Sequence, residues 1–146
     1  MKKTLIIFDV PATNGVIYTK EQFTRLRTYK NTSGFGDPET WEESLIDHFN
    51  NSGPKVMCGQ IGHPADSKIA LLKASHYVEN IRIEENELVG DVEILDTSSG
   101  KLLTDLIEHI VFRPRCLGSI TDDIAIIDEL IAFDALNKEQ DIWKIN

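Results

Sequence analysis

The sequence predicts a single α+β domain with a largely antiparallel sheet and a few helices. Three observations support this. The chain has 146 residues, which suits one domain, and no repeat, low-complexity tract or break in composition divides it. Hydrophobic residues make up 41% and charged residues 27%, as in folded proteins. Finally, strand-like segments cluster in the second half rather than alternating regularly with helices, which is typical of α+β folds.

The first half of the chain predicts one strand and two helices. Leu5 to Val10 is apolar and rich in β-branched and aromatic residues, and Pro11 ends it. Thr19, with Gln22 three residues later, forms a capping box for a helix that carries Phe23 and Leu26 on one face. Asp37-Pro38 predicts the start of a second helix, whose apolar stripe is Trp41, Leu45 and Phe49.

The second half is richer in strands. The segments 74–84 and 87–95 predict a hairpin around Glu85-Asn86, because apolar residues alternate along its second arm. Residues 101–110 have apolar residues at helical spacing, and 111–117 and 124–136 return to strand character.

Charge and composition exclude several classes of function. Fifteen Lys and Arg against 24 Asp and Glu give a net charge of −9, which argues against binding nucleic acid or an anionic membrane surface. No apolar run reaches the length of a membrane span, and the N-terminal apolar stretch is too short and too interrupted for a signal peptide. Cys58 and Cys116 are too few for a disulfide framework, so we expect reduced thiols.

No familiar catalytic or cofactor motif is present. His48 is expected at the surface, and His109 is expected to favour the C-terminal end of its helix through the helix dipole. His63 and His76 are more typical of structural histidines than of catalytic ones. No histidine or cysteine spacing predicts a metal site, and no glycine pattern predicts a nucleotide or other cofactor. The formal serine nucleophiles, none of which stands in a G-x-S-x-G motif, are Ser75, Ser98, Ser99 and Ser119.

Five short motifs, in order along the chain, resemble those of the prohead core proteases of T4-type phages. NGVIY at 14–18 resembles N-G-R-x-Y, GQIGHP at 59–64 resembles G-E-x-x-H-P, and SHYVENI at 75–81 resembles S-H-x-V-x-x-I. GDVEILDTSSGKLL at 90–103 matches G-x-x-x-I-L-x-T-x-x-G-K-x-L, and 111–119 with 127–136 resembles the closing strand pair. The likeness runs from about Phe8 to Leu136.

The resemblance implies an assemblin-like β-sheet or barrel core and a serine protease that trims scaffold and capsid proteins. It places the catalytic histidine at His76. The family's nucleophile segment falls on 111–119, where Arg115 and Gly118 fix the register and Arg113 and Pro114 occupy the serine positions. Neither residue can act as a nucleophile. His76 is therefore expected to be vestigial.

Two alternatives for the nucleophile remain, Cys116 and Ser119. Side chains alternate along a strand, so Arg113 and Arg115 are expected to share a face from which Cys116 points away. Ser119 lies still further along the strand. If the family register holds, His76 and Arg113 lie on adjacent strands, within ~10 Å between Cα atoms, and the two arginines fill the former cleft.

The sequence thus favours a non-enzymatic virion component: an auxiliary or decoration capsid protein of a tailed bacteriophage on an inactivated prohead-protease fold. The expected partner is the major capsid protein, with further copies of this chain on the lattice. Because packaged DNA repels a chain of charge −9, the outer capsid surface is the expected location after synthesis in the host cytoplasm. The alternatives are an active maturation protease that uses His76 with Cys116 or Ser119, and an internal scaffold-stage protein.

The C-terminal residues 137–146 form the predicted docking tail. Its apolar residues Ile142, Trp143 and Ile145 follow the last family-like strand and are candidate capsid contacts. The alternative is that Trp143 folds back onto the domain. On this hypothesis, deleting residues 141–146 leaves the domain folded and weakens its binding to capsids.

Overall fold

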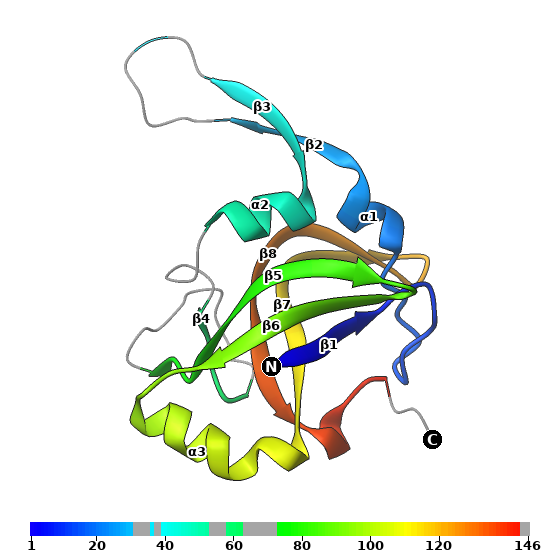
Figure 1. Cartoon of the computed structure of the whole chain (residues 1–146). Coiled ribbons are helices and arrows are strands. Elements are labelled where there is room, and N and C mark those ends of the chain that lie inside the picture. The colour runs from blue at the N-terminus through cyan, green and yellow to red at the C-terminus, as the bar shows by residue number, and fades with distance from the viewer. Residues whose placement is uncertain (31–35, 37–38, 53–57, 63–72, 144–146) are drawn as a thin grey trace.

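A computed structural model describes the chain except for residues 31–35, 37–38, 53–57, 63–72 and 144–146. A four-stranded antiparallel sheet has the order β1-β6-β5-β4, with β1 at Lys2–Ile7, β6 at Glu87–Ile94, β5 at His76–Glu84 and β4 at Cys58–Gly59. A long hairpin of β7 (Ile110–Thr121) and β8 (Ile124–Asn137) lies behind this sheet (Figure 1).

The hairpin joins the two edges of the four-stranded sheet. At one edge, Arg113 of β7 donates a hydrogen bond to the carbonyl oxygen of Thr4 in β1. At the other, Ala135 of β8 exchanges backbone hydrogen bonds with Gln60 and Gly62, just after β4. The result is a partly closed barrel, whose core holds the rings of Phe8, Phe23, Phe49, Phe112 and Phe133.

The helices cover the ends of this barrel. They are α1 (Lys20–Thr24), α2 (Leu45–Ser52) and α3 (Ser98–Leu106), and the short 3-10 turns η2 (Ile107–His109) and η3 (Lys138–Gln140) precede β7 and follow β8. Thr97 caps α3 by accepting a hydrogen bond from the backbone N–H of Gly100, and Leu103 faces the core. In the described part of the chain, no helix has the length and apolar character needed to cross a membrane.

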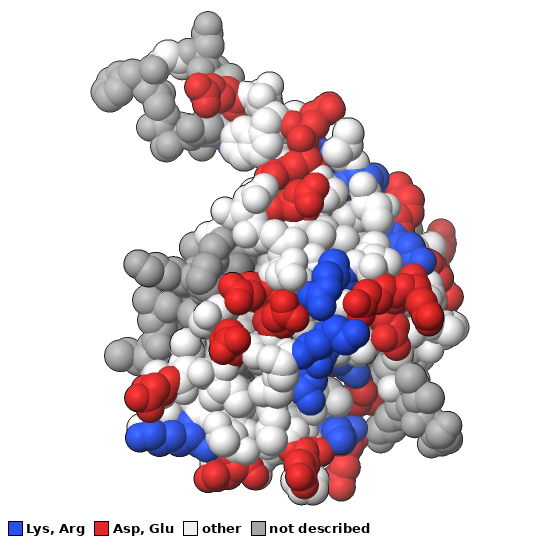
Figure 2. All heavy atoms as spheres, viewed as in Figure 1, with Lys and Arg blue, Asp and Glu red and all other residues white. Residues whose placement is uncertain are grey.

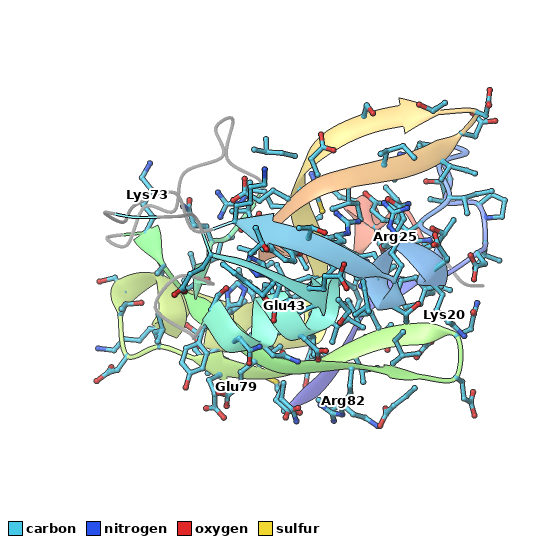
Figure 3. All side chains as sticks on the ribbon, turned by 90° about the horizontal axis from the view of Figure 1, so that it is seen from above. Lys20, Arg25, Glu43, Lys73, Glu79 and Arg82 are labelled. Carbon is cyan, nitrogen blue, oxygen red and sulfur yellow. The ribbon has the colours of Figure 1, made fainter. Side chains whose placement is uncertain are left out.

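A two-stranded ribbon of β2 (Leu26–Lys30) and β3 (Thr40–Ser44) projects from the barrel (Figure 1). Glu43 of β3 contacts α2 (Figure 3). Its carboxylate accepts hydrogen bonds from Trp41 and Asn51 and contacts the ring nitrogen of His48. The ring of Tyr29 stacks on that of His48 at 3.9 Å between centroids. These polar and aromatic contacts, rather than apolar burial, join the ribbon to the body.

The sequence expectations for the fold are largely confirmed. The single α+β domain, the hairpin around Glu85-Asn86, the third helix and the final strand pair are all present. The helix predicted from Asp37 is wrong at Trp41, which lies in β3 because it pairs with Tyr29 across the ribbon and stacks on its ring. Leu26 likewise begins β2 and is exposed instead of packing from a helix. Asp37-Pro38 falls outside the described residues.

Candidate functional site

His76, the residue at the family's catalytic histidine position, is completely buried. It begins β5, and its ring reaches across to β8. The Nε2 atom lies 2.7 Å from the carbonyl oxygen of Phe133, and Nδ1 lies 2.7 Å from the hydroxyl oxygen of Ser75. Both ring nitrogens are therefore engaged within the protein interior.

These contacts fix the state of the imidazole. A carbonyl oxygen can only accept, so Nε2 carries the proton, and in the neutral ring Nδ1 accepts from the Ser75 hydroxyl. Burial lowers the pKa of His76, although the hydrogen bond to Phe133 acts in the opposite direction. His76 is consequently neutral near pH 7, and its one lone pair is already occupied.

The backbone of β8 explains why the Phe133 carbonyl is available. The N–H and C=O of Ala135 point away from β7, toward Gln60 and Gly62. Phe133 lies two residues earlier, so its C=O points the same way and meets His76. Its partner across the hairpin is Pro114, at a position that needs no ladder hydrogen bond. Pro114 therefore fits into β7 without weakening the sheet.

The side chain that β7 presents to His76 is Phe112. The two rings pack edge to face with centroids 4.9 Å apart, and Phe112 is fully buried. Opposite, Gly59 of β4 brings its backbone against the imidazole: a Cβ there would lie 2.3 Å from Nε2 and 2.1 Å from the Phe133 oxygen. The space around His76 is thus filled by a phenyl ring and a glycine backbone.

Replacing Gly59 by alanine is expected to lower the free energy of unfolding by about 3 kcal/mol, because one clashing atom is backbone and cannot rotate away. Gly90→Ala is the matched control, since a Cβ there meets only side-chain atoms at 2.9 Å or more. Urea unfolding of both variants checks this. Equal effects of the two substitutions would contradict the packing described around His76.

Arg113 does not converge on His76, which corrects the expectation drawn from the motif register. The strands β5 and β7 are not paired, because β5 lies between β4 and β6 while β7 pairs with β8. The Arg113 guanidinium instead forms two hydrogen bonds of 2.7 Å with the carboxylate of Asp141. Side chains alternate along β7, so Phe112 faces the imidazole and the next residue does not.

Arg115 has a separate acidic partner. Its Nε lies 3.1 Å from Oδ2 of Asp134, and that carboxylate also accepts a hydrogen bond from the backbone N–H of Gln60. Asp134 is fully buried. The two arginines are therefore neutralised by different carboxylates and do not form the paired cationic filling of one cleft that the sequence predicted.

Cys116 and Ser119 are not brought to His76. The hairpin contacts His76 at Phe112 and Phe133, and the strand rise of ~3.3 Å per residue puts Cys116 about 13 Å, and Ser119 about 23 Å, further along β7. Irregularities in pairing occur on either side of Cys116–Leu117, but the extra residues belong to β8, so β7 keeps its alternation. Among the formal nucleophiles in the described part of the chain, Ser75 is the one whose hydroxyl contacts the His76 ring, and both residues are fully buried.

The expected exposure of the C-terminal residues is wrong for Trp143, which belongs to the core cluster. Its ring packs against Tyr18 at 5.3 Å and beneath the Arg113 guanidinium at 5.3 Å. Ile142 is partly buried, and its carbonyl accepts a hydrogen bond from the N–H of Thr13. The cause is Asp141, which must reach Arg113 and so draws the following residues onto the barrel. Ile145 and His63 lie outside the described residues.

Within the described ranges, no group of three His, Cys, Asp or Glu side chains is arranged to hold a metal ion. Sequence reasoning missed the two carboxylates that organise this region, Asp134 and Asp141, and considered Ser75 only as a formal nucleophile. The one sequence feature that indicates such partners is the pair of arginines at 113 and 115 in a predicted strand. Buried guanidinium groups require carboxylates, which must come from elsewhere in the chain.

This arrangement of sheet and hairpin is a prohead-protease-like α+β fold. The chain is similar to a solved structure of the bacteriophage T4 capsid assembly protease, gp21, with a TM-score of 0.70 and 17% sequence identity over 93% of this chain and 80% of that one. No protein-family model matches the chain, and a search of curated proteins gives no match. The fold implied by the five motifs is confirmed. Loss of proteolysis stays a prediction.

Proposed function

We propose that this chain is an auxiliary capsid protein of a tailed bacteriophage that uses a prohead-protease-like fold without cleaving peptide bonds. The observation that carries the proposal is the state of His76. A general base must offer a lone pair to a nucleophile next to a substrate, whereas His76 is buried, with both nitrogens bonded and a phenyl ring on its face. Arg113 and Pro114 at the family's serine positions support the same conclusion.

The likeness to the T4 capsid assembly protease supports a phage capsid context and, with it, the major capsid protein as partner. Copies of this chain on the capsid lattice are further contacts. Acidic side chains are scattered over the face seen in Figure 2, among uncharged residues, and a group of Lys and Arg lies near its centre. The net charge of −9 opposes contact with packaged DNA, which favours the outer surface of the shell.

The test is quantitative mass spectrometry of purified virions of the phage that encodes the chain. Full-length protein at high copy number is expected. Its absence from mature virions would overturn the auxiliary role and favour a protein that acts only before maturation. In parallel, purified protein incubated with scaffold and capsid proteins is expected to leave them intact. Cleavage that disappears in His76→Ala would establish the alternative, an active protease.

The thiol of Cys116 provides a second test of that alternative. Burial raises its pKa to about 12, the opposite of the shift that activates a nucleophilic cysteine. In a Cys58→Ser variant at pH 8, a thiol reagent is expected to react on the order of 100-fold more slowly with native than with urea-unfolded protein. Rapid native labelling that depends on His76 would identify Cys116 as a nucleophile.

A further inference from the structure

The far end of β7 is an exposed, uncharged strand. Five consecutive residues, 117–121, are exposed, and none of them carries a charge. Ile120 is 62% and Leu117 is 43% exposed. Apolar edge strands that are left open are sites where another chain can add a strand, and proteins generally protect such edges with charged residues. This segment has no such protection within itself.

Only one edge of this segment is paired. β8 lies on one side, and in Figure 3 the yellow β7 runs along the outer margin of the hairpin with the orange β8 on its inner side. The far edge of β8 is already occupied, because Ile17 exchanges backbone hydrogen bonds with residues 123 and 125. Among the described residues, no strand pairs with the outer edge of β7.

The backbone register identifies which groups are free on that edge. Ala125 uses its N–H toward Ile17, and the N–H of Ile127 bonds to the side chain of Gln22, so both residues point away from β7. Their partners across the hairpin are Ile120 and Gly118. In an antiparallel pair, such partners also point away from each other. Gly118 and Ile120 therefore direct their N–H and C=O groups outward.

A cavity of about 210 Å³ lies at this end of the hairpin, between β7, β8 and residues 14–18. β7 contributes Cys116, Gly118 and Ile120 to its lining, and Val16, Tyr18 and Ala125 contribute from the neighbouring segments. The Gln22 side chain fixes this end of the hairpin, since it bonds to the backbone of both Ala125 and Ile127. This end of the hairpin therefore combines free backbone groups on the outer edge of β7 with a recess between the hairpin and residues 14–18.

We propose that the outer edge of β7 at residues 117–121 binds an extended segment of the capsid protein as an added antiparallel strand. This inference rests on the proposed function for the source of the segment. Alternate apolar side chains of the segment would enter the recess and cover Ile120. Exposed carboxylates lie at the turn that ends this edge, Asp122 and Asp123, and on the neighbouring strand β8, Asp128 and Glu129, so the segment carries Lys or Arg at its ends. A second copy of this chain would bring the same carboxylates and is less favoured.

The probe is a fluorescent eight-residue peptide of alternating Val and Thr with Lys at both ends. Fluorescence anisotropy is expected to show saturable binding that weakens about tenfold or more when Glu replaces Lys in the peptide. Ile120→Pro removes an outward N–H without touching the β7–β8 ladder, and Ile120→Lys removes apolar contact. Both are expected to weaken binding about tenfold or more. Amide exchange at residues 118 and 120 should slow when the peptide binds.

Leu102→Lys on α3 is the matched control, because Leu102 is a similarly exposed apolar residue away from the hairpin. Absent binding, or binding that the Ile120 variants leave unchanged, overturns the proposed surface. Dimerisation of the free chain that Ile120→Pro abolishes would replace the capsid segment with a second copy. If the Ile120→Pro variant still co-purifies with capsids, the proposed binding role of the β7 edge is overturned but the proposed function is not. If the chain binds the peptide but does not associate with capsids, the proposed function is overturned but the peptide-binding role of the β7 edge is not.

Discussion

Replacing Asp141 by alanine is expected to lower the free energy of unfolding by about 3–5 kcal/mol, because it leaves the buried Arg113 guanidinium without its carboxylate. The loss extends beyond the ion pair, since Asp141 also accepts a hydrogen bond from the backbone N–H of Trp143 and so holds that ring against the Arg113 guanidinium. Deleting residues 141–146 is expected to have at least the same effect. Urea unfolding followed by circular dichroism measures both.

The same pair predicts an acid dependence. Burial raises the pKa of Asp141, but the hydrogen bonds and charge of Arg113 and the N–H of Trp143 outweigh it, so the folded-state pKa lies below its ordinary value. The stability that the pair contributes is therefore present above about pH 4 and is lost as the pH falls through the folded-state pKa. Asp141→Asn should flatten this part of the pH profile. If the pH dependence of stability is unchanged, or if the deletion variant is stable and fully folded, the Asp141–Arg113 pair does not hold the C-terminal residues in place. The hypothesis of an exposed docking tail would then be favoured again.

Asp134→Ala is expected to cost about 3–5 kcal/mol for the same physical reason, since Arg115 is buried beside it and the N–H of Gln60 loses its acceptor. The double variant Arg115→Met with Asp134→Leu should recover much of this loss, because it buries no unpaired charge. Thermal and urea unfolding of the single and double variants measure the two effects.

Asp91→Ala is the control for Asp134→Ala. Asp91 pairs with Arg82 on the outer side of the sheet, where both side chains are about one-third exposed and solvent screens the charges. Its removal is expected to leave the unfolding midpoint nearly unchanged. If Asp134→Ala also left the unfolding midpoint unchanged, this would contradict the buried hydrogen-bond network that links β8 to residue 60.

The second half of the fold could be predicted from local sequence. Alternation along 87–95 and the turn at Glu85-Asn86 predicted the β5–β6 hairpin, and the apolar spacing after Thr97 predicted α3. The same reasoning failed at Trp41 and Leu26, because helical spacing of apolar residues does not reveal that Trp41 stacks on Tyr29 across a projecting ribbon. Contacts between strands outweighed the local pattern there.

The sequence by itself determined which groups can react. At the positions where the motif register requires a serine it has none, and it carries arginines at 113 and 115. Only the tertiary structure decided where those groups point. Arg113 turns to Asp141, Arg115 pairs with Asp134, and Phe112 contacts the imidazole. The reason is that each buried guanidinium must be neutralised by a carboxylate. The carboxylates lie 28 residues from Arg113 and 19 residues from Arg115 along the chain, and no local sequence pattern predicts either pairing.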